Sequence, residues 1–477
     1  MTSTDNPQSL SDHTDARAIA LGFAAIVGAM LPAVLDQTIL ATALPTIAGE
    51  LGNVTDLSWV VTAYVVAAAA TTPLWGKLGD RHGRKRMLEL SLIVFVSSSA
   101  LCAAAQDITQ LIATRLLQGV AAGGLMTLAM AVVGDLVAPR QRGRYQGYIA
   151  ATFAVATIVG PLLGGVLVES ASWRWVFLVN LPLGAAALAG LAWRLPAPEQ
   201  SRPEQPLDTV GAALLAGTTS AFMLTCIWGG DRFGWGSPEN VGLIGVTVLL
   251  GVALVARERR SADPIVPLYL LRTRPVAVAS GALFLATAAL FAITVFVPLF
   301  LQTTTGASPT EAGLLLAPAM LGITVSTTLT GRSIAKTGRY KRFPVAGLLL
   351  MSAALVLLAA LAGEPSQLAV GIGLVVFGFG FGMVGQVLIV AVQNSVERRE
   401  LGVATATTGF FRAVGGAVGA AVLGAVFAAQ AGHGGTGIAD GVQTVFLVAA
   451  PLALLGALIV LLLDEVPLAE RLSPARG

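Results

Sequence analysis

The sequence has 477 residues, of which 55% are hydrophobic and only 12% are charged. Soluble domains carry about 25% charged residues, so this chain cannot build a water-soluble surface and must largely face lipid or itself. The net charge of +3 does not indicate a nucleic-acid-binding protein, because the basic residues form short clusters between apolar segments.

The chain begins with a polar stretch, Met1–Ala16, that lacks the basic start and the cleavage site of a secretory signal. We expect it to be a short disordered tail, and we expect the apolar segment after it to remain as a helix. Both cysteines, Cys102 and Cys226, lie inside apolar segments, whereas the three histidines lie outside them. The sequence therefore predicts neither a disulfide framework nor a metal site.

The apolar segments predict an all-α membrane protein. A helix of about 20 apolar residues crosses the hydrocarbon core of a bilayer. That length predicts fourteen transmembrane helices, at 18–42, 57–76, 87–106, 109–133, 146–168, 173–194, 208–228, 240–257, 275–301, 311–331, 343–362, 367–393, 402–429 and 442–463. No polar stretch between them is long enough to be a soluble domain.

The 29 lysine and arginine residues orient these helices. Arg115 and Arg412 fall inside predicted spans, and Arg174 and Arg232 fall in loops on one side of the membrane. The other 25 (29 less these four) fall at the termini or in the alternate loops, which is a strong positive-inside pattern. It predicts that both termini are cytoplasmic and that the number of spans is even.

Two polar linkers, Leu195–Pro206 and Arg257–Pro275, divide the spans into groups of six, two and six. The predicted domains are a disordered tail at 1–16, a six-helix bundle at 17–195, a linker with two inserted transmembrane helices at 196–274, a second six-helix bundle at 275–463 and a cytoplasmic tail at 464–477.

Four motifs accompany this layout. The loop after the second span reads Gly76-Lys77-Leu78-Gly79-Asp80-Arg81-His82-Gly83-Arg84-Lys85-Arg86. The first span contains Leu35-Asp36-Gln37-Thr38-Ile39, the fourth Arg115-Leu116-Leu117-Gln118-Gly119, and the fifth Gly160-Pro161-Leu162-Leu163-Gly164-Gly165. With these motifs, the sequence resembles the fourteen-helix drug:proton antiporters of the major facilitator superfamily. The resemblance implies the major facilitator fold and proton-coupled export of lipophilic, often cationic compounds by alternating access across a bacterial inner membrane.

Proton coupling needs an ionisable group inside the membrane, and such groups usually mark function. Asp36 is the only carboxylate well inside a predicted span, and Arg115 is its natural partner. We expect Asp36 to alternate between a protonated state and a state paired with substrate or Arg115. A static ion pair is the structural alternative.

The loop after the second span and the motif of the fifth span predict gating. We expect Asp80 to cap a helix N-terminus while Arg84 reaches a second acid, Asp135. The resemblance implies that these residues, with the other main loop positions, close the cytoplasmic side in one state; the other positions are Gly76, Arg81, Gly83 and Lys85. In the fifth span, small residues and a proline permit close packing and a bend, and the resemblance implies a seal against proton leak; the residues are Gly160, Pro161, Gly164 and Gly165.

The signal for a substrate cavity is weaker. An apolar cavity with few polar groups suits lipophilic compounds, and the polar and aromatic residues in or near spans are candidates to line it: Gln37, Tyr64, Gln118, Phe284, Gln302, Gln386, Gln393, Asn394, Phe410 and Arg412.

No phosphate-binding loop is present in the sequence, so no cofactor is expected beyond the proton gradient. The expected partners are the lipid bilayer, protons and a small lipophilic substrate, with the chain acting as a monomer and not as an enzyme. Two alternatives remain: the same antiporter with a dedicated native cargo, such as a lipid, a siderophore or an endogenous antibiotic, and a membrane-integral enzyme or receptor.

Overall fold

The computed structural model describes residues 7–51, 57–194, 207–229, 232–261, 263–304, 316–362, 367–431, 437–466 and 468. Regular structure in these ranges is helical, and they contain no strand beyond an isolated bridge between Gly229 and Phe233. Thirteen helical segments of this part are long and apolar enough to cross a membrane. The prediction of an all-α, multi-pass membrane protein is therefore confirmed.

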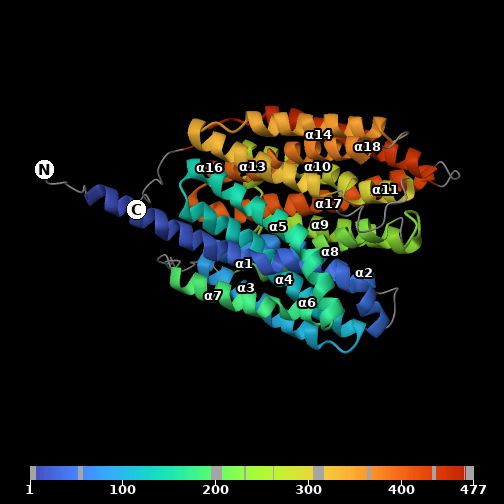
Figure 1. The fold of residues 1–477 in the computed structure, drawn as a ribbon, viewed down its shortest axis with the longest axis horizontal. Coiled ribbons are helices and arrows are strands. Elements are labelled where there is room, and N and C mark those ends of the chain that lie inside the picture. The colour runs from blue at the N-terminus through green and yellow to red at the C-terminus, as the bar shows by residue number, and fades with distance from the viewer. Residues whose placement is uncertain are drawn as a thin grey trace. The chain divides into compact units, whose positions relative to one another are not determined.

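Two compact units emerge from the contacts within the chain, and each is described here by itself. The first comprises residues 1–68, 75–138 and 155–203. Its helices are α1 (Pro7–Leu51), α2 (Leu57–His82), α3 (Arg84–Ala104), α4 (Ile108–Leu136), the second half of α5 (Pro139–Ser170), α6 (Trp175–Leu178) and α7 (Asn180–Arg194) (Figure 1).

The second unit comprises residues 69–74, 139–154 and 204–477, and so includes the first half of α5. Its other helices are α8 (Thr209–Trp228), α9 (Pro238–Glu258), α10 (Arg274–Phe291), α11 (Val297–Thr304), α13 (Ala317–Thr337), α14 (Arg342–Ala360), α15 (Gln367–Gly382), α16 (Gly385–Ser395), α17 (Leu401–Ala431) and α18 (Gly437–Leu461) (Figure 1). A π-helical segment, Ala292–Phe296, joins α10 to α11.

Several helices extend beyond their predicted spans; for example, α2 ends six residues later and α5 begins seven residues earlier than predicted. The first helix begins at Pro7, so residues 7–16, expected as a disordered tail, continue α1. The tenth predicted span, 311–331, corresponds to α13, which ends six residues later at Thr337. At 21 residues α13 is long enough to cross a bilayer, but its threonines and Arg332 make it less apolar than the thirteen other segments.

Local sequence explains where several helices begin and end. The Asp107 carboxylate accepts a hydrogen bond from the Gln110 backbone N–H at 2.8 Å and so caps α4. Gly83, with φ of 92°, separates α2 from α3 in a backbone conformation that side chains disfavour. Gly338 ends α13 as a left-handed C-cap with φ of 69°.

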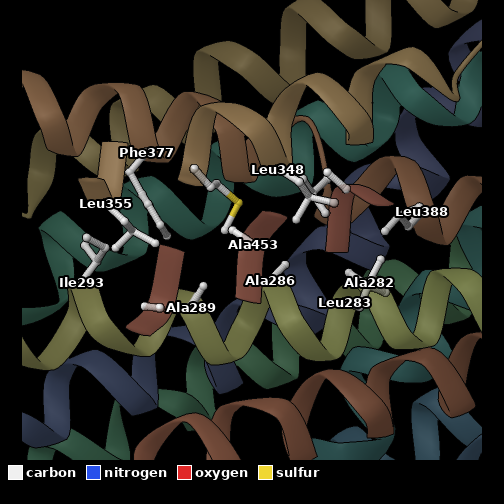
Figure 2. Close-up of a cluster of buried hydrophobic side chains, with 14 of the residues drawn as sticks. Ala282, Leu283, Ala286, Ala289, Ile293, Leu348, Leu355, Phe377, Leu388 and Ala453 are labelled. Carbon is white, nitrogen blue, oxygen red and sulfur yellow. The ribbon is translucent and has the colours of Figure 1, made fainter. Parts of the chain in front are cut away.

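Small residues form the centre of the core in the second unit. Ala282, Ala286 and Ala289 recur every three or four positions along one face of α10 and are fully buried (Figure 2). Leu348 and Leu355 of α14 belong to the same buried cluster. Without large side chains on this face, α10 can pack closely against its neighbours, as membrane helices commonly do.

Helices α8 and α9, which correspond to the two predicted inserted spans, pack mainly on each other, and α8 also contacts α17. Along α9 only Asn240 and Glu258, near its two ends, are buried. The middle of α9 is apolar and exposed, as expected for a helix that faces lipid on most sides.

Candidate functional site

Asp36 lies near the middle of the span Ile19–Leu51 and its side chain is fully buried. A charge at this depth is costly unless a partner neutralises it. The partner is Arg115 of α4, whose Nη1 lies 2.5 Å from Asp36 Oδ2, and neither side chain is more than 1% exposed. The two predicted coupling residues therefore form one buried ion pair.

The rest of the Arg115 guanidinium is also occupied. Its Nε donates to the Val60 carbonyl at 3.2 Å, and its Cζ lies 4.2 Å from the centre of the Tyr64 ring. A second ring, that of Phe177, has its centre 5.9 Å from Cζ. The backbone acceptor and the ring faces stabilise the cation in addition to the carboxylate.

Neutral polar groups complete the shell of Asp36. Gln118 donates from Nε2 to Asp36 Oδ1 at 3.1 Å and accepts from Arg115 at 2.7 Å, so it bridges both charges. Asn180 Nδ2 lies 3.4 Å from Asp36 Oδ1 and donates to Ser99 Oγ at 2.9 Å. The Asn180 Oδ1 atom is buried without a hydrogen-bond partner in the described part of the chain. This unpaired acceptor belongs to a side chain whose other end faces the Asp36 carboxylate.

The fifth-span motif lies directly against the helix that carries Asp36. A side chain at Gly160 would overlap Thr38, and one at Gly164 would overlap Thr42. The Thr38 hydroxyl lies 3.2 Å from the Ala156 carbonyl, which ties α1 to α5 at this point. Small residues in α5 therefore set how close the two helices come. By contrast, a side chain at Gly165 would meet nothing within 4 Å, and Pro161 of the same motif is exposed.

A second ion cluster lies at the ends of α2, α3 and α4. Arg84 donates from Nε to Asp80 at 2.8 Å and from Nη1 to Asp135 at 2.5 Å. The predicted contact between Arg84 and Asp135 is present, whereas the expectation that Asp80 caps the next helix is wrong. Gly83 is the N-cap of α3 and no side chain caps it, because Asp80 lies in the last turn of α2 and faces Arg84.

The other predicted gating residues of this loop lie in α2 and α3. Gly76 is buried within α2 and Arg81 lies in its last turn. Lys85 points elsewhere, with its Nζ 3.4 Å from the Ala192 carbonyl of α7 and 3.8 Å from Glu89.

In the second unit, Arg412 and Gln386 line one cavity of about 40 Å³. α5, α13, α15, α16 and α17 contribute to its wall, with Thr327 and Phe381 among the other lining residues. The Gln386 Oε1 atom is buried without a hydrogen-bond partner in the described part of the chain. Two of the predicted cavity residues are thus brought together.

The remaining predicted cavity residues are dispersed. Tyr64 and Gln118 belong to the group of side chains around the Asp36–Arg115 pair, which we call the Asp36 cluster. Exposed Gln37 has its Nε2 3.5 Å from the Tyr64 hydroxyl. The other five lie in the second unit. Gln393 donates to Thr405, Asn394 donates to the Val466 carbonyl, Phe410 packs edge-on against Phe411, Phe284 is half-buried on α10, and Gln302 lies in α11 with its side chain outside the described residues.

Sequence reasoning missed two members of the Asp36 cluster, Ser99 and Asn180. Ser99 ends a run of three serines in the third span, and Asn180 follows a short aromatic motif at the start of α7. Both are fully buried. Buried polar residues in an apolar span need partners, so their position in the spans was a usable signal, although the sequence does not say which partners they meet.

Comparison with known proteins gives a family. The model of the Major Facilitator Superfamily matches residues 26–420. The uncharacterized MFS-type transporter Rv1877 of Mycobacterium tuberculosis is 42% identical over 407 residues, which are 85% of this chain and 59% of that protein. The multidrug transporter protein MdtP of Bacillus subtilis is 34% identical over 86% of this chain and 75% of its own.

Among solved structures, the human organic anion transporter MFSD10 superposes with a TM-score of 0.69. The alignment covers 93% of this chain and 99% of that chain at 19% identity, so the likeness concerns the fold alone. The chain spans about three fifths of the length of its mycobacterial relative.

Proposed function

The chain belongs to the major facilitator superfamily, and from that premise we propose that it exports lipophilic, often cationic compounds in exchange for protons. It does so by alternating access across a bacterial inner membrane. The multidrug transporter of Bacillus subtilis at 34% identity supports export of drug-like cargo. The buried pair of Asp36 and Arg115 carries the proposal, because it is an ionisable group in the membrane with a built partner.

The proposed coupling step is a change of partner at Asp36. A proton that binds Asp36 removes the negative charge and releases Arg115, which keeps its bonds to Gln118 and the Val60 carbonyl. Loss of the proton restores the ion pair. The open Asn180 Oδ1 gives a water molecule an acceptor beside Asp36 during the exchange.

The proton gradient supplies enough free energy for this exchange. One pH unit is worth about 1.4 kcal/mol for each proton, and 100 mV is worth about 2.3 kcal/mol for each charge. One proton therefore supports a cargo gradient of roughly a hundredfold or more. This exchange requires no nucleotide.

Two elements are proposed to control access. The Arg84 cluster with Asp80 and Asp135 closes the cytoplasmic side in one state, and its charge-assisted bonds must break for the other. The contacts of Gly160 and Gly164 with α1 seal the protein around Asp36 against proton leak.

The proposed layout has fourteen spans as six, two and six, with α13 as the tenth and with both termini in the cytoplasm. The thirteen apolar segments and α13 supply that number of helices, and the distribution of lysine and arginine supplies the orientation.

The experiment is proton release in inverted membrane vesicles. A proton gradient is imposed, ethidium or another lipophilic cation is added, and collapse of the gradient is compared between the intact protein and Asp36→Asn. We expect collapse only with the intact protein, a difference of about 100-fold in rate or more. Equal amounts of both proteins in the membrane serve as the control.

A variant that collapses the gradient as fast as the intact protein would place the coupling group elsewhere. A second outcome is that no lipophilic cation in a broad panel collapses the gradient although the vesicles remain tight. That outcome would contradict drug export and favour the same antiporter with a dedicated native cargo.

A further inference from the structure

Charges deep inside the described spans are few. Three charged side chains lie about two turns or more from both ends of their span, namely Asp36, Arg115 and Arg412. Asp36 and Arg115 neutralise each other in the first unit. Arg412 makes no ion pair and no hydrogen bond with any residue of the described part. It therefore leaves one uncompensated positive charge within the membrane-spanning part of the second unit.

Arg412 has an exposed side chain but lies deep within its span. It lies eleven residues after Leu401, the first residue of α17, which is about 17 Å along the helix axis. Arginines near the end of a span extend to the headgroups, but Arg412 instead lines the cavity of about 40 Å³. That volume holds a few water molecules or a small charged group, and it does not hold a whole drug-sized molecule.

The start of a helix lies at another part of the cavity wall. Helix α15 ends at Gly382, and α16 begins at Gly385 without a side-chain N-cap. Gly385 and Gln386 line the cavity, so the first turn of α16 lies at its wall. The free N–H groups and the positive end of a helix dipole favour negative charge there, and Gln386 adds an amide that can donate.

We propose that Arg412, Gln386 and the start of α16 bind the anionic group of the exported cargo. The preferred cargo is then a lipophilic compound that carries a carboxylate or sulfonate, alone or beside a positive charge. This inference rests on the proposed export function and narrows it. The guanidinium binds two oxygens of the anion side by side, which an ammonium in its place does less well.

The experiment measures binding to the full-length protein in lipid nanodiscs without any gradient. Dansylglycine, which carries a carboxylate, is compared with dansylglycinamide, which has the same rings and no charge, and with ethidium, a cation. We expect the intact protein to bind dansylglycine at least tenfold more tightly than the amide, the size of one hydrogen bond to a charged group. Equal affinity for the two in the intact protein overturns the proposal, and this arm needs no variant.

Variants then assign the preference to Arg412. Arg412→Gln should abolish the tenfold preference and leave ethidium binding equal or tighter, whereas Arg412→Lys should keep part of it. Arg274→Gln, the same change at a 72% exposed position, should keep all of it. A preference that survives Arg412→Gln overturns the proposal. Ethidium-driven proton release in vesicles is a separate readout, so loss of coupling with an intact carboxylate preference contradicts only the proposed function.

Discussion

Arg115 and Arg412 are both arginines well inside an apolar helix, yet Arg115 is buried and Arg412 is exposed. Arg115 has a carboxylate at 2.5 Å, an amide, a carbonyl and two aromatic rings, and it is 1% exposed. Arg412 has no described partner and borders a cavity. The Arg115 guanidinium is thus paired within the protein, whereas the Arg412 guanidinium has no partner among the described residues.

The difference has a physical consequence for stability. A satisfied buried pair makes each partner depend on the other, because removal of one leaves an unpaired charge in a low-dielectric site. Arg412 has no such dependence, because its exposed side chain has no described partner that its removal would leave unpaired.

The largest expected effect is the contrast between Arg115→Met and Arg412→Met. Arg115→Met should destabilise the protein by about 3–5 kcal/mol, because Asp36 is left buried and unpaired. Arg412→Met should change stability by less than about 1 kcal/mol or increase it. Thermal unfolding of both variants in the same detergent tests the contrast.

A double variant checks the cause. Asp36→Asn with Arg115→Met removes both charges, so it should be more stable than Arg115→Met alone. If Arg412→Met were as damaging as Arg115→Met, Arg412 would have an essential partner that the comparison has missed.

The next effect concerns the packing of α5 against α1, which should influence the Asp36 site but not the cavity beside Arg412. Gly160→Ala should cost about 1–3 kcal/mol and slow proton release, because the added methyl group overlaps Thr38, two residues after Asp36. Gly165→Ala is the matched control, since a side chain there meets nothing within 4 Å. Carboxylate binding by the second unit should be unchanged in both. Unfolding temperatures and proton release in vesicles measure the first effect, and dansylglycine binding measures the second.

Relief of the overlap provides a further check. Adding Thr38→Ala to Gly160→Ala should recover much of the loss, whereas no recovery would mean that the damage does not arise from the contact between α1 and α5.

Much of this architecture could be predicted from the sequence, because hydropathy largely determines which segments form membrane-spanning helices. Most helices lie within a few residues of the predicted spans, and the pairing of Asp36 with Arg115 followed from their being rare charges in spans. Helix α13 was harder to delimit, since its threonines and glycines blur the boundary of the apolar segment.

Side-chain partners that depend on helix rotation could not be predicted. Sequence spacing places Ser99 and Asn180 in spans, but only the packing of α3, α6 and α7 brings them to Asp36. Similarly, nothing in the run from Gln386 to Asn394 shows that the first lines a cavity with Arg412 while Gln393 bonds to Thr405. These contacts are set by tertiary structure, which hydropathy does not encode.

The smallest expected effect extends the comparison to an ion pair in which only the arginine is exposed. Asp208 lies outside the spans and accepts hydrogen bonds from Arg257 at 3.0 and 3.1 Å, which lower the pKa of its carboxyl to about 2. The pKa of an aspartate in an unfolded chain is about 3.9. The stabilisation is therefore complete above that pH and is lost as the pH falls toward 2. Since Arg257 is 46% exposed, we expect less than about 1 kcal/mol.

Asp208→Asn tests this half-exposed pair, because asparagine still caps α8 through the Gly211 N–H but does not carry the charge. Intact protein and variant should differ in unfolding temperature at pH 5 and converge as the pH approaches 2, and added salt should reduce the difference. Asp107→Asn, at a helix cap without an ion pair to a described residue, is the matched control for loss of a capping carboxylate. If Asp208→Asn were as damaging as Arg115→Met, burial of both partners would not be what makes the Arg115 pair indispensable, and the contrast between Arg115 and Arg412 would need another cause.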